Sequence, residues 1–317
     1  MSKQIPISLH FTFQDYKNEE AKLNKSIADN DQVFSKEKME ESLKIMEVFK
    51  IGYFNTWIHS SIYTDFSDKK EMVKEMEKIL NKYPNIRISS LHYNGSIFDL
   101  DEEQNIRNRE QMEKYVELIK KLRPNAIVVH PGVFGEGGFA KNLPNYQKAV
   151  EVLGEEKVKE LVADNLRHFG KVGAKYNIKI AVENIFKGRV YSKIPDLISL
   201  IEEVNLENVG YCLDIGHAHY DEVDIVNTIR LMKEKLFELH LSDNAKDRDA
   251  HLPIGFGTIN WIEIIKALKE IEYKGTATFE FFRWPTKDKE KGIGLAIEMC
   301  KNLEKIAENN YHTLNYL

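Results

Sequence analysis

The chain contains very little cysteine, and this scarcity excludes two kinds of architecture. Its 317 residues include only Cys212 and Cys300, which lie far apart in apolar stretches and have no CxxC spacing. A disulfide framework or a zinc site built from thiolates needs more cysteines at closer spacing. We therefore expect both cysteines to be buried free thiols.

Long apolar segments are also missing. The first residues, MSKQIPISLHFTF, do not form the apolar stretch of a signal peptide. No run reaches the ~18 apolar residues that are needed to span a bilayer. These absences lead us to expect a cytoplasmic protein that has no membrane partner.

A strong excess of basic residues is absent as well. Forty-five Lys and Arg residues stand against fifty Asp and Glu residues, which gives a formal net charge of -5. Because nucleic-acid-binding proteins commonly carry a marked positive charge, this balance favours a small-molecule substrate over nucleic acid. It does not exclude a local basic groove, and it leaves the oligomeric state open.

What the sequence does contain is a regular alternation of short apolar runs and longer helical patterns. No Pro/Ser-rich linker and no block of like charges divides the chain. Ser35 is predicted to cap a helix that carries Met39, Leu43 and Met46 along one face. The predicted strands are the segments 5–11, 52–58, 86–93, 126–132, 178–184, 209–215, 236–243 and 276–282.

These eight strands predict a parallel sheet. They are rich in Ile and Val, and each is followed by a segment long enough to cross back over the sheet as a helix. An open doubly wound sheet fits the same alternation, but no GxGxxG or Walker sequence stands at a strand-to-helix turn. We therefore predict an α/β fold in which residues 1–317 form a single (β/α)8 TIM barrel domain.

Ionisable residues gather where the predicted strands end. In a TIM barrel, the C-terminal strand ends and the loops that follow them carry the chemistry. Within a predicted helix, by contrast, lies His168, to which we assign no role. The strand-end and loop positions hold His10, His92, His130, Glu183, Asp214, His217, His240, Asp243, Asp249, His251 and Glu280.

This concentration predicts a metal site. A single histidine of this kind is more often a hydrogen-bonded, half-buried imidazole than a metal ligand. Carboxylates beside apolar strand residues, as in AVEN, CLDI and TFEF, are costly to bury without cations, so several that converge require a divalent ion. Mixed oxygen and imidazole donors suit zinc or manganese better than calcium. We expect one to three such ions.

The stretch after the seventh strand, HLSDNAKDRDAHLPIGFGTINW, is the most specific segment of the chain. It combines a strand-end His240 with Asp249 and His251, which are two residues apart, and a glycine-containing turn precedes the next helix. Lys246 and Arg248 lie in the same segment and offer cations for a phosphate or carboxylate on the substrate.

At these residues the sequence resembles the xylose isomerase-like barrel superfamily, which contains sugar and sugar-phosphate isomerases and epimerases and the endonuclease IV-type apurinic endonucleases. The resemblance spans nearly the whole chain. It implies a quartet of metal ligands, one from each of strands five to eight: Glu183, Asp214, His240 and Glu280. The zinc endonuclease branch uses further ligands, which correspond here to His92, His130, His217, Asp249 and His251.

The leading hypothesis is a metal-dependent isomerase or epimerase that acts on a sugar or sugar phosphate. Glu183 and Glu280 would act as general base and acid, and the ion would stabilise an enediolate. The segments LHYNGS, ENIFKGR and HLPIGFGTINW resemble sugar-directed relatives, and the loops 59–68 and 94–101 hold no Lys or Arg. The predicted substrate contacts are His10, His217, Lys246 and Arg248.

The alternative hypothesis is a zinc phosphodiesterase of the endonuclease IV-type class. Clustered ions would activate a water and clamp the scissile phosphate, and Glu183 would bridge two of them. A third class, a non-catalytic sugar-binding barrel, has little use for so many converging carboxylates. We therefore expect an enzyme.

Overall fold

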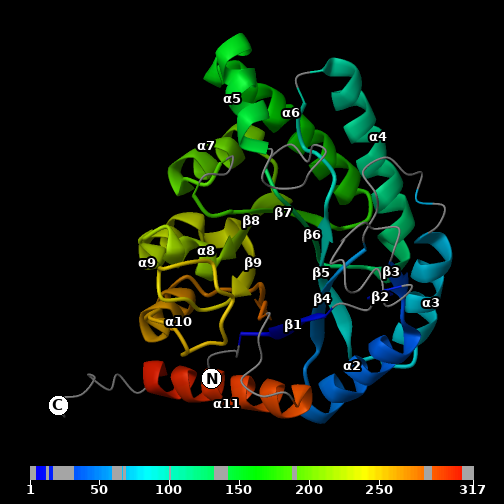
Figure 1. Cartoon of the computed structure of the whole chain (residues 1–317), viewed down its shortest axis with the longest axis vertical. Coiled ribbons are helices and arrows are strands. Elements are labelled where there is room, and N and C mark those ends of the chain that lie inside the picture. The colour runs from blue at the N-terminus through cyan, green and yellow to red at the C-terminus, as the bar shows by residue number, and fades with distance from the viewer. Residues whose placement is uncertain are drawn as a thin grey trace.

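A closed barrel of parallel strands forms the centre of the molecule. The structure, a computed structural model, describes residues 5–11, 14–16, 32–58, 66, 69–99, 101–131, 142–187, 191–281 and 288–308. Eight strands close in the order β1-β10-β9-β8-β7-β6-β5-β4, and helices surround them (Figure 1). The predicted (β/α)8 barrel is therefore confirmed.

Each barrel strand falls within one of the predicted segments. Nearly all of their side chains are buried, because the helices cover the outer face of the sheet and side chains fill the interior. The strands are β1 (Ile7–Phe11), β4 (Tyr53–Trp57), β5 (Arg87–Tyr93), β6 (Ala126–Val129), β7 (Lys179–Glu183), β8 (Val209–Asp214), β9 (Leu236–Leu241) and β10 (Thr276–Phe279).

The helices follow the strands and bury their apolar faces against the sheet. The Ser35 hydroxyl accepts a hydrogen bond from the backbone N–H of Lys38, which confirms the predicted cap, and Met39, Leu43 and Met46 are fully buried. The helices are α2 (Lys36–Phe49), α3 (Lys70–Leu80), α4 (Glu102–Ile119), α5 (Asn142–Leu153), α6 (Glu155–Ala174), α7 (Ile194–Val204), α8 (Ile215–Tyr220), α9 (Ile225–Met232), α10 (Trp261–Glu270) and α11 (Lys289–Glu308), with 3-10 turns η3 (Lys120–Leu122) and η5 (Lys233–Lys235).

One element of the fold was not predicted from the sequence. An antiparallel pair, β2 (Gln14–Tyr16) and β3 (Gln32–Phe34), lies between β1 and α2. Strands of three residues are too short to show a hydrophobic alternation. The hydrophobic pattern of the sequence therefore gives no indication of β2 and β3.

The barrel interior is more polar than its Ile/Val-rich strands suggest. Asn55, Ser90 and Glu238 are buried inside it. The carboxylate of Glu238 accepts hydrogen bonds of 2.5 Å from the hydroxyls of Thr276 and Thr278. A polar network of this kind can remain buried because its donors and acceptors form hydrogen bonds with one another.

The two cysteines differ in burial. Cys212 is fully buried in β8, and Cys300 on α11 is partly buried and packs against the apolar core, so the prediction of two buried thiols is confirmed for the first and only in part for the second. The outer side of α11 faces solvent, as the exposed Leu295 and Met299 show. Among the helices that the structure describes, none is long and apolar enough to cross a bilayer.

Candidate metal centre

Four strand-end side chains meet at one end of the barrel. Glu183 ends β7, Asp214 ends β8, His240 lies in β9 and Glu280 directly follows β10. All four are nearly or fully buried, and one ligand atom from each lies within 4.8 Å of the others. Ligands that bind one ion at about 2.0–2.6 Å lie within about 5 Å of each other. The geometry therefore fits one divalent ion.

The contacts within this quartet show how closely the donors face one another. His240 Nδ1 lies 3.2 Å from Glu183 Oε1 and 3.1 Å from Glu280 Oε2. Asp214 Oδ2 is buried and has no hydrogen-bond partner among the described residues. A buried carboxylate oxygen without a partner is costly, and a bound cation would remove that cost. Three carboxylates and one imidazole suit manganese or zinc.

A second group of donors consists of His217, Asp249 and His251. Asp249 Oδ2 lies 3.5 Å from His217 Nε2 and 3.1 Å from His251 Nε2. The Nδ1 atoms face backbone carbonyls instead, those of Asn184 at 2.9 Å and Glu280 at 2.8 Å. Metal-binding histidines are commonly oriented in this way, with one nitrogen donating to a carbonyl and the other free for the ion.

The backbone of His251, in the loop after β9, is in the left-handed region. Its φ angle is 43°, a conformation that residues other than glycine rarely adopt.

A third group joins His92 and His130 to Glu183. One ligand atom from each lies within 4.8 Å of the others, and His130 Nε2 is 3.0 Å from Glu183 Oε2. Neither ring nitrogen of the buried His92 has a hydrogen-bond partner among the described residues. Its ring stacks between Trp57, at a centroid distance of 4.1 Å, and His240, at 5.1 Å. Glu183 thus belongs both to the quartet and to this group.

The charges at the site balance one another when no metal is bound. Burial alone would raise the pKa of Glu183. Nearby imidazoles, of which that of His240 has the largest effect, outweigh burial and hold this pKa well below its ordinary value. Burial alone would lower the pKa of His217, yet Asp214 and Asp249 raise it to about 10. Protons on histidines therefore compensate the carboxylates, and divalent ions can replace those protons.

Asp243 was a strand-end candidate, and the structure gives it a different environment from the three groups. Its fully buried carboxylate accepts hydrogen bonds of 2.9 Å from the backbone N–H of Gly255 and from the indole N–H of Trp261. A Cβ atom on Gly257 would lie 2.2 Å from Asp243 Oδ1, so only glycine fits there. Asp243 therefore holds the loop that carries the Asp-x-His pair.

A cavity of about 190 Å³ opens onto the three donor groups. Ligand pockets for drug-sized molecules usually measure about 300–1,000 Å³, so this one suits a small ligand. The apolar walls formed by Trp57, Ile185 and Phe186 were not predicted, although each follows or ends a strand. The lining residues are Trp57, His92, His130, Glu183, Ile185, Phe186, His217, Asp249, His251 and Glu280, with no Lys or Arg from the described part of the chain.

Two predicted substrate contacts lie outside this lining. The side chain of Lys246 is 3.6 Å from Glu222, and that of Arg248 is 68% exposed and 4.0 Å from Asp247. Both cations point to neighbours or solvent along the loop surface. The geometry gives no support to their predicted role in holding a substrate anion.

His10 is also absent from the cavity lining. Its Nδ1 lies 2.6 Å from Asn55 Oδ1, and its Nε2 accepts a hydrogen bond of 3.0 Å from Trp57 Nε1. Both ring nitrogens are thus engaged inside the barrel. One ligand atom of His10 lies within 4.8 Å of ligand atoms of His92 and Glu280, so His10 borders the candidate site, and its contact with substrate stays a prediction.

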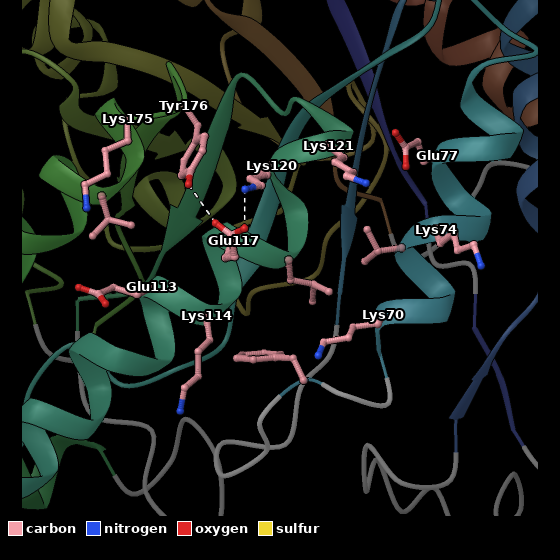
Figure 2. A pocket seen from close by; sticks show the side chains of 14 residues that line it. Lys70, Lys74, Glu77, Glu113, Lys114, Glu117, Lys120, Lys121, Lys175 and Tyr176 are labelled. Atoms are coloured by element: carbon pink, nitrogen blue, oxygen red, sulfur yellow. Dashed lines mark hydrogen bonds and ion pairs between the residues drawn. The ribbon is translucent and has the colours of Figure 1, made fainter.

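A larger cavity lies on the outer surface and is not the candidate site. It measures about 740 Å³ and is lined by residues of α3, α4, η3 and the end of α6. Figure 2 shows lysines spread around it and Glu117 accepting hydrogen bonds from Lys120 and Tyr176, the latter at 2.9 Å. None of its lining residues belongs to a donor group found among the described residues. Size alone therefore does not identify the site.

Sequence comparison places this chain in a family. A model of the xylose isomerase-like TIM barrel family matches residues 45–303, which is most of the chain. The chain belongs to this family. Its relatives and structural neighbours include several sugar epimerases and isomerases.

Individual relatives of this family member are distant. The D-psicose 3-epimerase of Enterocloster bolteae is 28% identical over 120 residues, or 37% of this chain and 38% of that protein. The probable endonuclease 4 of Mycoplasma capricolum subsp. capricolum is 23% identical over 198 residues, or 58% and 62%. The chain spans about half the length of the curated relatives it matches.

Among solved structures, the IOLI protein with a bound zinc atom resembles this chain with a TM-score of 0.66 and 19% identity, covering 84% of this chain and 92% of the other. At this identity the likeness shows the fold. A shared fold does not establish a shared reaction.

Proposed function

We propose that this chain is a divalent-metal-dependent isomerase or epimerase of a small sugar. The observation that carries the proposal is the placement of Glu183 and Glu280, whose carboxylates flank His240 at 3.2 and 3.1 Å within one buried quartet. The two glutamates come from β7 and from the end of β10, which β8 and β9 separate in the barrel. They therefore reach a bound substrate from different sides.

Two carboxylates in this arrangement can move a proton between neighbouring carbons or between the two faces of one carbon. Glu183 would accept the proton from the carbon beside the carbonyl, and Glu280 would return one. A bound divalent ion would polarise the carbonyl and stabilise the negative charge that develops on its oxygen. His217, which lines the cavity, would orient a substrate hydroxyl.

The cavity walls support a sugar substrate. Trp57, Ile185 and Phe186 offer apolar surface to the C–H faces of a sugar ring or chain and exclude water from the reacting carbons. Because no Lys or Arg from the described residues lines the cavity, a neutral sugar fits better than a sugar phosphate. The kinship with sugar epimerases agrees with this choice.

A second candidate function is zinc-dependent phosphodiester hydrolysis. The observation that favours it is the third donor group, His92, His130 and Glu183, which a one-ion isomerase would not need. Several neighbouring ions can activate a water and clamp a phosphate. The small cavity without Lys or Arg among its described lining residues ranks this function second, because a duplex binder grips many phosphates with cationic side chains.

One experiment separates the two functions. The purified protein, loaded with zinc or with manganese, is tested on a panel of free and phosphorylated ketoses and on duplex DNA that contains an abasic site. We expect interconversion of a ketose to be more efficient than cleavage of DNA. Robust cleavage at abasic sites that weakens with salt and is abolished by His92→Ala or His251→Ala would overturn this choice.

A further inference from the structure

A chain of hydrogen bonds runs through the barrel interior beneath the site. Trp57 Nε1 donates to His10 Nε2 at 3.0 Å, and His10 Nδ1 lies 2.6 Å from Asn55 Oδ1. Asn55 Nδ2 donates to Ser90 Oγ at 2.7 Å, and Ser90 is hydrogen-bonded in turn to Glu238. Neighbouring strands supply the first links, since the register pairs His10 with Asn55 and Asn55 with Ser90.

The direction of this chain is fixed by its first member. An indole N–H can only donate, so the Nε2 atom of His10 must be an acceptor without a proton. The proton of a neutral ring then resides on Nδ1, which donates to the amide oxygen of Asn55. The amide nitrogen of Asn55 then donates to the hydroxyl of Ser90, and that hydroxyl donates to the Glu238 carboxylate, where the chain ends. One tautomer of His10 satisfies every link.

The indole of Trp57 connects this chain to the candidate metal centre. Its ring meets His10 edge to face, with centroids 6.0 Å apart and planes at 86°, and stacks on His92 at 4.1 Å and 18°. Since His92 has no hydrogen-bond partner among the described residues, stacking sets the orientation of its ring. In this respect it differs from His217 and His251, whose Nδ1 atoms face backbone carbonyls.

We propose that His10 and Trp57 are positioning residues. The hydrogen-bond chain anchored at His10 holds the Trp57 indole in place, and the flat face of that indole orients His92 toward His130 and Glu183. This role differs from the predicted contact between His10 and substrate, because it acts through Trp57 and His92. The inference rests on the metal-dependent site of the proposed function and is independent of which reaction the site performs.

Metal binding by matched variants tests this role without an activity assay. Wild type, Trp57→Phe, Trp57→Leu and His10→Phe are dialysed against increasing chelator concentrations, and zinc per chain is measured by mass spectrometry. Trp57→Phe keeps a flat ring but loses the N–H that donates to His10, so we expect it to retain zinc less well than wild type and better than Trp57→Leu. Trp57→Leu and His10→Phe should bind one zinc equivalent about 10–100-fold more weakly, the usual effect of removing a residue that orients a metal ligand.

His168→Phe is the control for the aromatic substitution, because His168 lies on α6 with its Nε2 3.0 Å from Glu113 and belongs to none of the donor groups. It should retain zinc as wild type does. Zinc retention by folded Trp57→Leu and His10→Phe that equals the wild-type value would overturn the proposal.

A measurement on the wild-type protein keeps the proposal testable if the variants fail to fold. Nitrogen NMR of the labelled metal-free protein reports which ring nitrogen of His10 carries a proton. We expect Nδ1 to be protonated and Nε2 to be coupled to the indole nitrogen of Trp57 across their hydrogen bond. A proton on Nε2 would contradict the proposal. Absence of ketose turnover, with these readouts as expected, would refute the proposed reaction alone.

Discussion

Two of the cavities in this structure hold many ionisable side chains and arrange them in opposite ways. One cavity opens onto the candidate metal centre at the end of the barrel, which is called the mouth below. There the buried carboxylates of Glu183 and Glu280 both lie near 3 Å from His240 Nδ1. On the outer surface, Glu117 and Lys120 are a helical i,i+3 pair whose side chains are 60% and 31% exposed. The mouth concentrates charge at one place, and the outer cavity spreads it along its edges (Figure 2).

This difference shows that burial separates a candidate site from a solvated surface better than the number of charges does. A buried carboxylate persists only when a proton, a cation or a hydrogen bond compensates it, so convergence of several carboxylates indicates a function. Exposed ion pairs are solvated by water and contribute about 0–1 kcal/mol each. Changes at the mouth should therefore have large effects on function, and changes at the outer cavity small ones.

The largest effect is expected for Glu280→Gln at the mouth. The substitution keeps the shape of the side chain but removes a proton carrier and one negative charge of the quartet. Turnover of the ketose substrate should fall by about 10²–10⁴-fold, the usual contribution of a general acid or base. Activity and metal content are measured on the same preparation. Wild-type activity in a well-metallated variant would remove Glu280 from the mechanism.

Metal removal should abolish activity and also lower the melting temperature. An ion that binds only the folded chain stabilises it by about 2.7 kcal/mol when its concentration is 100 times its dissociation constant. We expect the melting temperature to drop by several degrees after chelation and to recover, together with activity, when zinc or manganese is returned. Full activity and an unchanged melting temperature after exhaustive chelation would show that the mouth works without metal.

The metal-free mouth should also make stability depend on pH. Burial opposes protonation of both His217 and His251. For His217, Asp214 and Asp249 outweigh burial and raise the pKa to about 10. For His251, Asp249 raises the pKa to about 9. The ordinary value in an unfolded chain is about 6.5. Because the folded values are raised, this stabilisation is complete below about pH 6.5 and disappears as the pH passes through 9 to 10.

The melting temperatures of the metal-free and the zinc-loaded protein are compared by thermal unfolding between pH 6 and 10. The metal-free protein should lose a few degrees of melting temperature over the alkaline half of this range, while the zinc-loaded protein should change less. A metal-free protein that becomes more stable as the pH rises would contradict the charge balance described for the mouth.

The smallest effect is expected at the outer cavity. Replacing Lys114 and Lys121 together by Gln removes two exposed charges from its lining. Surface substitutions of this kind usually change the free energy of unfolding by no more than about 0.5 kcal/mol each. We expect turnover and Michaelis constant to stay within about twofold of wild type. A tenfold loss would mean that the outer cavity takes part in function.

The sequence predicted the barrel well because its strands carry strong local signals. Runs rich in Ile and Val, each followed by an amphipathic helix, are typical of parallel strands, and all eight predicted segments contain a barrel strand. The β2–β3 pair escaped because its strands are too short to show a periodicity. The donor groups could be predicted because strand ends of a barrel meet at one end, so position along the chain implies proximity.

The remaining site features depend on contacts that no local pattern encodes. Asp243 and Asp249 lie in one loop, but hydrogen bonds from Gly255 and Trp261 engage the first carboxylate and leave the second facing two histidines. The bond between His10 and Trp57 crosses two strands in the same way. Residue type suggested a site role for Asp243 and His10, but it could not predict the hydrogen bonds that engage both side chains in the fold.

Diffraction from crystals of the metal-loaded protein, measured on both sides of the zinc or manganese absorption edge, tests the metal centre most directly. We expect an anomalous peak within about 2.0–2.6 Å of one ligand atom from each of Glu183, Asp214, His240 and Glu280. Additional peaks at the other two donor groups would extend the centre to two or three ions. An active, fully loaded crystal without a peak among these four side chains would contradict the assignment.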